Sequence, residues 1–150
     1  VNKSILDLEP IMSWHTKIAH IKELEPNREI SYGGTFKTDR VTKVATIPVG
    51  YADGFPRCLS NKGRVIINGK YAKILGRVCM DQFMVDVSDI ECDINDEVIL
   101  VGTQKNAHIS LDELSNSAYS FNYELPCRIP ARVNRVYFYN GKAVKDVGLV

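Results

Sequence analysis

The sequence lacks long apolar runs, a net charge and a secretion signal, and each absence excludes a class of protein. No apolar run approaches the roughly 20 residues that a membrane-spanning helix needs. The formal net charge is +1, so no overall field draws the chain to nucleic acid or to an acidic membrane surface. The opening segment, Val1-Asn-Lys-Ser-Ile5, does not begin with Met and has no charged stretch leading into an apolar core. We therefore expect a cytoplasmic piece of a longer protein that contacts neither nucleic acid nor membrane.

Cysteine and histidine are both scarce, which argues against disulfide and metal sites. The four cysteines include no Cys-x-x-Cys pair and are spread along the chain: Cys58, Cys79, Cys92 and Cys127. So scattered a set fits neither a disulfide framework nor a zinc site. The three histidines are also dispersed, and His15 and His20 would point to opposite faces of one strand. We predict free thiols in a reducing compartment and no metal site.

The sequence also lacks the motifs of self-contained catalytic sites. It holds no Gly-x-Gly-x-x-Gly, no Gly-x-x-x-x-Gly-Lys-Ser/Thr, no His-Glu-x-x-His and no Gly-x-Ser-x-Gly. These absences count against nucleotide binding, zinc proteolysis and serine hydrolysis. Asp81 and Asp86 would lie on opposite faces of an extended strand, so they do not predict a glycosidase pair. The chemistry left to the chain consists of tyrosines and arginines set beside glycines.

Alternating apolar residues predict strands along most of the 150-residue chain. Segments 18–24 and 43–49 have this pattern, and residues 98–101 form a short apolar run that Gly102 should end. Asn68-Gly69 and Asn140-Gly141 each stand between two strand-like runs. Because Asn-Gly provides the two positive-φ residues of a type I′ turn, both sites predict β-hairpins.

One segment has the pattern of a helix. Ser110 and Glu113 form a capping box, and Leu111, Leu114 and Ala118 then share one face. The apolar content of 45% and the length fit one globular domain, residues 1–150. Many short strands between turns predict a mainly β fold, a closed or nearly closed β-barrel or sandwich with one or two short helices.

Four motifs set tyrosine and arginine beside glycine, in a definite order. They are Ser31-Tyr-Gly-Gly-Thr-Phe36, Ile47-Pro-Val-Gly-Tyr-Ala-Asp-Gly-Phe-Pro-Arg57, Gly76-Arg-Val-Cys-Met-Asp-Gln82 and Asn122-Tyr-Glu-Leu-Pro-Cys127, with Arg132-Val-Asn-Arg135 behind the last. In this order and spacing the chain, from about Ile11 to its end, resembles the carboxy-terminal half of alanine racemases. Phe36 departs from the tyrosine that relatives often carry, which concerns packing more than catalysis.

The resemblance implies an enzyme that interconverts L- and D-alanine, with serine as a lesser substrate, for cell-wall peptide synthesis. Such racemases are homodimers in which an amino-terminal (β/α)8 barrel holds pyridoxal 5′-phosphate on a lysine and a β-rich carboxy-terminal domain follows. Each active site forms where the barrel of one subunit meets the carboxy-terminal domain of the other. The present chain corresponds to the second domain, so we expect it to be inactive alone.

The resemblance assigns the catalytic role to Tyr32. The tyrosine of this motif moves the proton of the substrate α-carbon on the face opposite the lysine. Racemisation needs two such groups, because one proton leaves one face of a cofactor-stabilised carbanion and another returns to the opposite face. Gly33 and Gly34 suit the sharp chain reversal that would present the tyrosine ring.

By the same resemblance, five residues contact the substrate and one contacts the cofactor. The substrate residues are Tyr51, Arg57 and Arg77 in the access corridor, Met80, whose backbone amide helps to hold the substrate carboxylate, and its neighbour Asp81. Tyr123 matches the tyrosine that donates to the cofactor phosphate. Because this tyrosine would leave a small apolar niche beside the substrate β-carbon, we expect alanine to be preferred over serine by roughly tenfold to a hundredfold.

Two other interpretations stay open. One is the racemase half of a membrane-anchored serine racemase of the kind tied to glycopeptide resistance, because the distinguishing segment would lie upstream. The other is a stand-alone β-barrel that binds RNA or single-stranded nucleic acid through Arg128, Arg132, Arg135 and exposed tyrosines. The charge of +1 disfavours that module. We expect the three arginines to be solvated charges on an outer strand.

Overall fold

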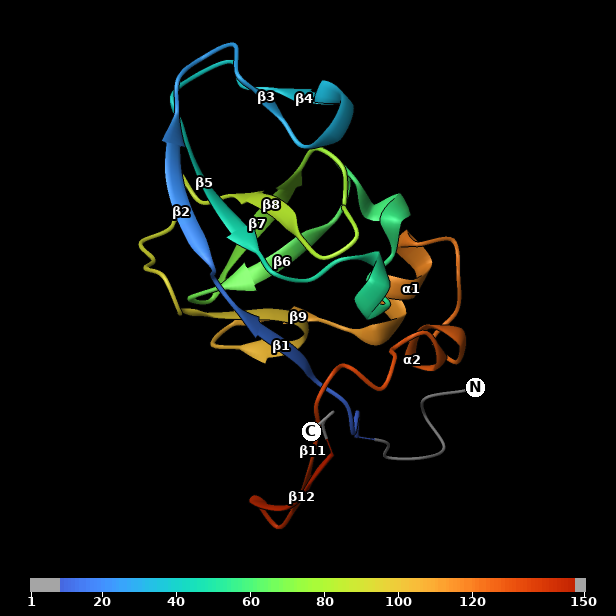
Figure 1. Cartoon of the computed structure of the whole chain (residues 1–150). Helices are drawn as coiled ribbons and strands as arrows, with labels where there is room; N and C mark the ends of the chain where they lie inside the picture. The colour runs from blue at the N-terminus through green and yellow to red at the C-terminus, as the bar shows by residue number, and fades with distance from the viewer. Residues whose placement is uncertain (1–8, 148–150) are drawn as a thin grey trace.

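The chain folds into a mainly β domain with two short helices, as the computed structural model of residues 9–147 shows (Figure 1). The opening segment Val1–Ile5 lies outside the described residues. The helices are α1 (Leu111–Ser117) and α2 (Glu124–Cys127). The strands are β1 (Trp14–Lys17), β2 (His20–Leu24), β3 (Glu29–Ile30), β4 (Phe36–Lys37), β5 (Thr42–Ile47), β6 (Arg64–Ile67), β7 (Lys70–Leu75), β8 (Phe83–Asp86), β9 (Glu97–Gln104), β10 (Ala107–Ile109), β11 (Arg135–Tyr139) and β12 (Lys142–Val147).

The main sheet curls until its two edges belong to one continuous stretch of chain. Its strand order is β1-β9-β6-β7-β8-β5-β2, with β10 paired to β9. The edge strands β1 and β2 are separated by Ile18 and Ala19 alone. The Ile18 N–H donates to the Asp96 carbonyl on the β9 side, and the Ala19 N–H donates to the Thr46 carbonyl on β5, at 3.0 Å each. The hydrogen-bonded path is therefore open but nearly closed, which confirms the predicted fold class.

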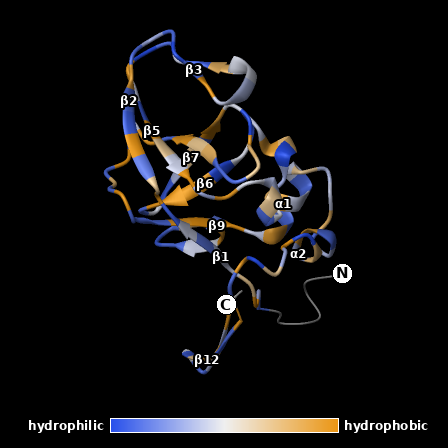
Figure 2. Cartoon of the chain, in the orientation of Figure 1, coloured by the Kyte–Doolittle hydropathy of each residue, from blue (hydrophilic) through white to orange (hydrophobic). Residues whose placement is uncertain are grey.

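The core inside this sheet also fixes the loop that contains Phe55. Phe55 and Phe83 are completely buried and their rings stack at 4.8 Å, while Trp14 meets Phe55 edge-on at 6.0 Å. The buried apolar residues come mainly from the strands of this sheet, and much of β6 and β9 is coloured as hydrophobic in Figure 2. Because Phe55 lies two residues after the turn at Tyr51–Asp53, its burial fixes that turn to the core.

Both Asn-Gly hairpins are confirmed, and one predicted strand end is wrong. Asn68 and Gly69 have φ of 51° and 82°, and the Asn140–Gly141 turn also has two positive values. Strand β9, however, continues through Gly102 to Gln104. Gly102 adopts φ 131° and pairs with Ile109 of β10, so the neighbouring strand prolongs the ladder that the glycine was expected to end.

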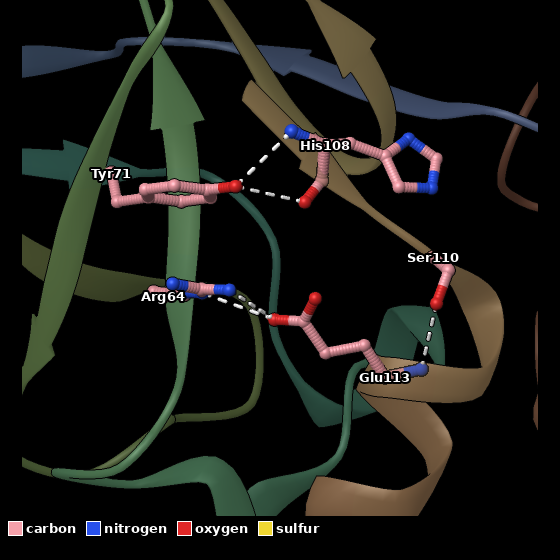
Figure 3. Close-up of polar contacts among 5 residues, drawn as sticks. All are labelled: Arg64, Tyr71, His108, Ser110 and Glu113. Carbon is pink, nitrogen blue, oxygen red and sulfur yellow. Dashed lines mark hydrogen bonds and ion pairs between the residues drawn. The ribbon is translucent and has the colours of Figure 1, made fainter. Parts of the chain in front are cut away.

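Helix α1 is fixed to the β6–β7 hairpin by a group that we call the α1 anchor: Arg64, Tyr71 and Glu113 (Figure 3). The Ser110 hydroxyl accepts the Glu113 N–H at 2.9 Å, which is the first half of the predicted capping box. The Glu113 carboxylate instead accepts from Arg64 at 3.0 and 2.8 Å. The Arg64 guanidinium lies 3.8 Å above the Tyr71 ring, whose hydroxyl donates to the His108 carbonyl. The anchor therefore joins four segments on one side of the barrel.

The cysteines were predicted to be free thiols. All four cysteines are free, with Cys58 and Cys127 exposed and Cys79 and Cys92 buried, which confirms the predicted thiols.

Strands β11 and β12 form a hairpin whose residues are all exposed, and it projects from the barrel (Figure 1). Within residues 9–147, no helix has both the length and the apolar character to cross a membrane.

Candidate active site

One pocket brings together six of the seven predicted site residues. It has a volume of about 670 Å³ and is lined by Tyr32, Tyr51, Arg57, Arg77, Val78, Cys79, Met80, Asp81 and Gln82. These residues come from three turns: one between β3 and β4, one after β5 and one between β7 and β8. A second hollow, of about 490 Å³ and lined partly by Lys70, Asp93 and Lys105, contains none of the motif residues.

The turn that presents Tyr32 has a backbone conformation that side chains rarely permit. Gly33 and Gly34 have φ of 70° and 55°, which fits the predicted chain reversal. Ser31 has φ 66° and ψ 177°, a conformation that costs a residue with a side chain about 1–3 kcal/mol. Its hydroxyl donates to the Arg77 carbonyl at 2.7 Å, which ties the turn to the neighbouring loop. The Tyr32 side chain is 75% exposed, so its phenol is open to a group outside this chain.

The turn that carries Tyr51 and the loop that carries Met80 meet backbone to backbone. The Tyr51 N–H donates to the Cys79 carbonyl and the Ala52 N–H to the Met80 carbonyl, both at 3.0 Å. A Cβ at Gly50 would lie 2.2 Å from the Met80 carbonyl oxygen, so no larger residue fits there. Gly50 is thus required because the backbones of two segments of this chain approach each other closely.

The Met80 amide and the pocket arginines form the polar part of the lining. Among the described residues, the Met80 N–H has no hydrogen-bond partner, and the side chain is exposed. Arg57 and Arg77 add two positive charges to the lining. The residues that line this pocket thus carry an N–H donor and two guanidinium groups, which are the groups that recognise a carboxylate.

Sequence reasoning missed an arginine that joins two of the turns. We call Arg132, Asp53 and Asp81 the Arg132 clamp. Arg132 Nε donates to Asp53 Oδ1 at 2.9 Å, and Nη2 donates to Asp81 Oδ1 at 2.8 Å. The hydrogen bond to Asp81 and the charge of Asp53 raise the pKa of Arg132 above its usual value. Asp81, predicted to contact substrate, therefore has a partner within the chain.

The prediction of solvated arginines on an outer strand is wrong for two of the three. Arg128 follows α2 and pairs with Glu124, and Arg132 lies in the loop before β11; Arg135 is in β11. The partners of Arg132 are separated from it by 79 and 51 residues. No local spacing in the sequence could have indicated these pairs, although the Arg132-Val-Asn-Arg135 motif pointed to the segment.

Tyr123, the seventh predicted residue, is not part of the pocket lining. It is the N-cap residue of α2, its side chain is 74% exposed, and its ring lies 6.5 Å from the ring of Phe121. The structure therefore separates the predicted phosphate-binding tyrosine from the pocket that contains Tyr32.

Known proteins are similar to this chain in sequence and in fold. The family described as "Alanine racemase, C-terminal domain" matches residues 11–137. The alanine racemase of Clostridium novyi is 48% identical over 147 residues, which cover 97% of this chain and 38% of that protein. The alanine racemase of Halothermothrix orenii is 49% identical over 133 residues, covering 88% of this chain and 35% of that protein.

Solved structures agree. The alanine racemase of Bacillus anthracis with bound L-Ala-P superposes with a TM-score of 0.91 at 40% identity, covering 96% of this chain and 37% of that one. The alanine racemase of Clostridium difficile 630 in complex with cycloserine has a TM-score of 0.89 at 40% identity, covering 99% and 39%. This chain thus spans less than two-fifths of these relatives' length. It belongs to the alanine racemase family and represents the C-terminal domain of that family.

Proposed function

We propose that residues 1–150 form the C-terminal domain of a pyridoxal-phosphate-dependent alanine racemase that acts as a homodimer. The observation that carries the proposal is the pocket in which Tyr32, Tyr51, Arg57, Arg77, Met80 and Asp81 meet. The cofactor-binding barrel would lie in the part of the relatives that this chain does not span. The pocket of this domain would then face the barrel of the second subunit, and the full-length protein would serve the supply of D-alanine to cell-wall peptides.

Tyr32 is the group that moves the proton at the substrate α-carbon. Its exposed phenol projects from a turn of unusual conformation, which the Ser31 hydroxyl holds to the adjoining loop. A general acid–base group must reach the reacting carbon from a fixed direction, and a turn held in this way provides that direction.

The substrate carboxylate is held by the Met80 N–H. This donor has no partner among the described residues, and the loop that carries it is fixed to the Tyr51 turn by two backbone hydrogen bonds. Arg57 and Arg77 favour entry of an anionic group into the pocket. Tyr51 and Asp81 border the same space.

This chain offers some, but not all, of the groups that would hold pyridoxal phosphate. Tyr123 offers an exposed phenol that can donate to a phosphate oxygen. The pocket lining includes no lysine among the described residues, so the lysine that binds pyridoxal phosphate would come from outside this chain. When bound, the cofactor supplies an electron sink that stabilises negative charge at the substrate α-carbon.

Alanine is the substrate that we propose, with serine turned over less well. The relatives reported above are named alanine racemases, and one of them was solved with L-Ala-P. No comparison favours the membrane-anchored serine racemase. The nucleic-acid module is disfavoured because Arg128 and Arg132 are paired with carboxylates. Four free thiols support a cytoplasmic location.

The test uses the full-length protein that carries this chain. We expect pyridoxal-phosphate-dependent racemisation of L- and D-alanine, with kcat/KM for serine lower by roughly tenfold to a hundredfold. The isolated 150-residue chain should show no turnover under the same conditions. Turnover of serine above alanine would overturn the substrate proposal alone, whereas absence of any racemisation by the cofactor-loaded full-length protein would overturn the function.

A further inference from the structure

We propose that Arg132 is a positioning residue for substrate binding: its guanidinium holds the Tyr51 turn and the Met80 loop in one arrangement. In that arrangement the Met80 N–H faces the substrate carboxylate. The inference rests on the proposed function, because it assigns to Arg132 an effect on the same pocket. It adds a residue that none of the motif assignments placed at the site.

Arg132 contacts the two segments through separate carboxylates. Toward the Tyr51 turn, its Nε and Nη2 lie 2.9 and 2.8 Å from Asp53 Oδ1. Toward the Met80 loop, Nη2 lies 2.8 Å from Asp81 Oδ1. The Asp53 side chain is 16% exposed and the Asp81 side chain 62% exposed. The contact to the turn is therefore better shielded from water, and that to the loop is the weaker one.

Both carboxylates that Arg132 contacts are linked to Met80, one through the packing of Gly50 and the other through the chain itself. Asp53 also accepts the Gly50 N–H at 2.8 Å, and Gly50 lies against the Met80 carbonyl, where a Cβ would be only 2.2 Å from its oxygen. Asp81 is the residue that follows Met80 in the chain. A Cβ at Gly50 would also lie 2.3 Å from the Cys79 carbonyl oxygen, which shares a peptide unit with the Met80 N–H. A guanidinium that holds both carboxylates thus restrains the peptide units before and after Met80.

Arginine suits this role for a geometric reason. Its planar guanidinium directs several N–H donors in fixed directions, so one group can hold two carboxylates at defined positions. Lysine would keep the charge but would hold the carboxylates as a compact, rotatable point charge. The loop of Arg132 has a further contact with the domain, since Gly54 packs closely on the Arg128 carbonyl. Attachment of this loop to the domain therefore does not depend on Arg132 alone.

The experiment compares three variants of the full-length, cofactor-loaded enzyme: Arg132→Met, Arg132→Lys and, as a matched control, Arg64→Met from the α1 anchor. A contact to the carboxylate acts equally in the ground state and the transition state, so its loss raises KM with little change in kcat. We expect Arg132→Met to raise the KM for alanine by roughly tenfold to a hundredfold, the ratio expected when a hydrogen bond to a charged group is weakened or lost. Arg132→Lys should recover part of this loss, and Arg64→Met should leave KM unchanged.

Asp53→Asn keeps the volume of the side chain and weakens the same clamp, so it serves where Arg132→Met fails to fold. It should raise KM by a smaller factor in a protein of normal melting temperature and cofactor affinity. An unchanged KM in folded Arg132→Met or Asp53→Asn enzyme overturns the inference, and so does an equal rise in Arg64→Met. Failure of the proposed function has a different signature, because the cofactor-loaded wild-type protein would then show no racemisation of alanine and no KM to compare.

Discussion

Two arginine clusters in this domain use the same chemistry for different ends. In the α1 anchor, Arg64 bonds Glu113 and stacks on Tyr71, joining α1 to the barrel wall through residues that do not line the pocket. In the Arg132 clamp, the guanidinium bonds Asp53 and Asp81 at the rim of the pocket. The N–O distances are all 2.8 Å and the two arginine side chains are similarly exposed, at 45% and 41%, so an arginine–carboxylate pair does not by itself indicate function. What differs is the neighbour: a helix cap in one case and, in the other, the Met80 amide, which has no hydrogen-bond partner among the described residues.

This contrast between the two clusters predicts how substitutions at each should affect catalysis and stability. Changes at Tyr32, Tyr51 and Met80 in the pocket should alter catalysis with little effect on stability, because these residues are exposed. Changes at the anchor should alter stability with little effect on catalysis.

Tyr32→Phe should have the largest effect on catalysis and almost none on folding. Loss of a general acid–base group costs about 10²–10⁴-fold in rate, and the Tyr32 side chain is 75% exposed, so its hydroxyl supports no core packing. Steady-state kcat and the melting temperature of the full-length variant measure the two effects. A variant with near-normal kcat would remove Tyr32 from the mechanism, and a large fall in melting temperature would break the division between pocket and anchor.

Ser31→Ala should reduce kcat by about tenfold, which corresponds to the roughly 1–1.5 kcal/mol of one hydrogen bond. The change removes the bond from the Ser31 hydroxyl to the Arg77 carbonyl while leaving a β-carbon in the strained conformation. The Tyr32 ring would lose its fixed direction. Ser31→Ala also removes the contact of this hydroxyl with Cys79 Sγ at 3.2 Å. Ser110→Ala is the matched control, since it also removes a serine hydroxyl but at the cap of α1. It should lower stability by about 1 kcal/mol and leave kcat unchanged. Equal kcat in wild type and folded Ser31→Ala would contradict the positioning role of the turn.

Arg64→Met should lower local stability by about 1 kcal/mol, from loss of a half-exposed ion pair and of the cation–π contact. Hydrogen exchange of the α1 amides would then be about fivefold faster, because 1 kcal/mol corresponds to that ratio. Leu114 and Leu125 remain buried and keep the helices in place. Unchanged exchange would show that the anchor contributes nothing measurable, and altered kinetics would show that it is coupled to the site.

Acid should weaken a third polar cluster, remote from the pocket motifs. The Asp93 backbone N–H and the Asn68 side chain hold the pKa of Asp96 below its usual value. A carboxylate with a lowered pKa stabilises the fold above its unfolded pKa of about 3.9, and that contribution is lost as the pH falls through the folded pKa. The difference in melting temperature between wild type and Asp96→Asn should therefore shrink below about pH 4. A difference that stays constant from pH 7 to pH 3 would contradict the assignment.

Local patterns predicted more of this domain than long-range contacts did. Asn68-Gly69 and Ser110 act within a few residues of themselves, so their turn and cap could be predicted from composition and spacing. The extent of β9 depends on β10 beside it, and the pairing of Arg132 depends on residues 51 and 79 positions away. The motif residues of the pocket were identified by resemblance, because no spacing rule brings residue 32, residue 51 and residue 80 to one place.

Exchange of the α-proton with solvent distinguishes whether Tyr32 serves one face of the substrate or both. The experiment follows loss of deuterium from α-deuterated L-alanine and D-alanine by NMR, in wild-type and Tyr32→Phe full-length enzyme loaded with cofactor. If Tyr32 acts from a single side, the variant loses exchange from one enantiomer by about 10²-fold or more and retains it from the other. Equal retention of exchange from both enantiomers in the variant would contradict the account.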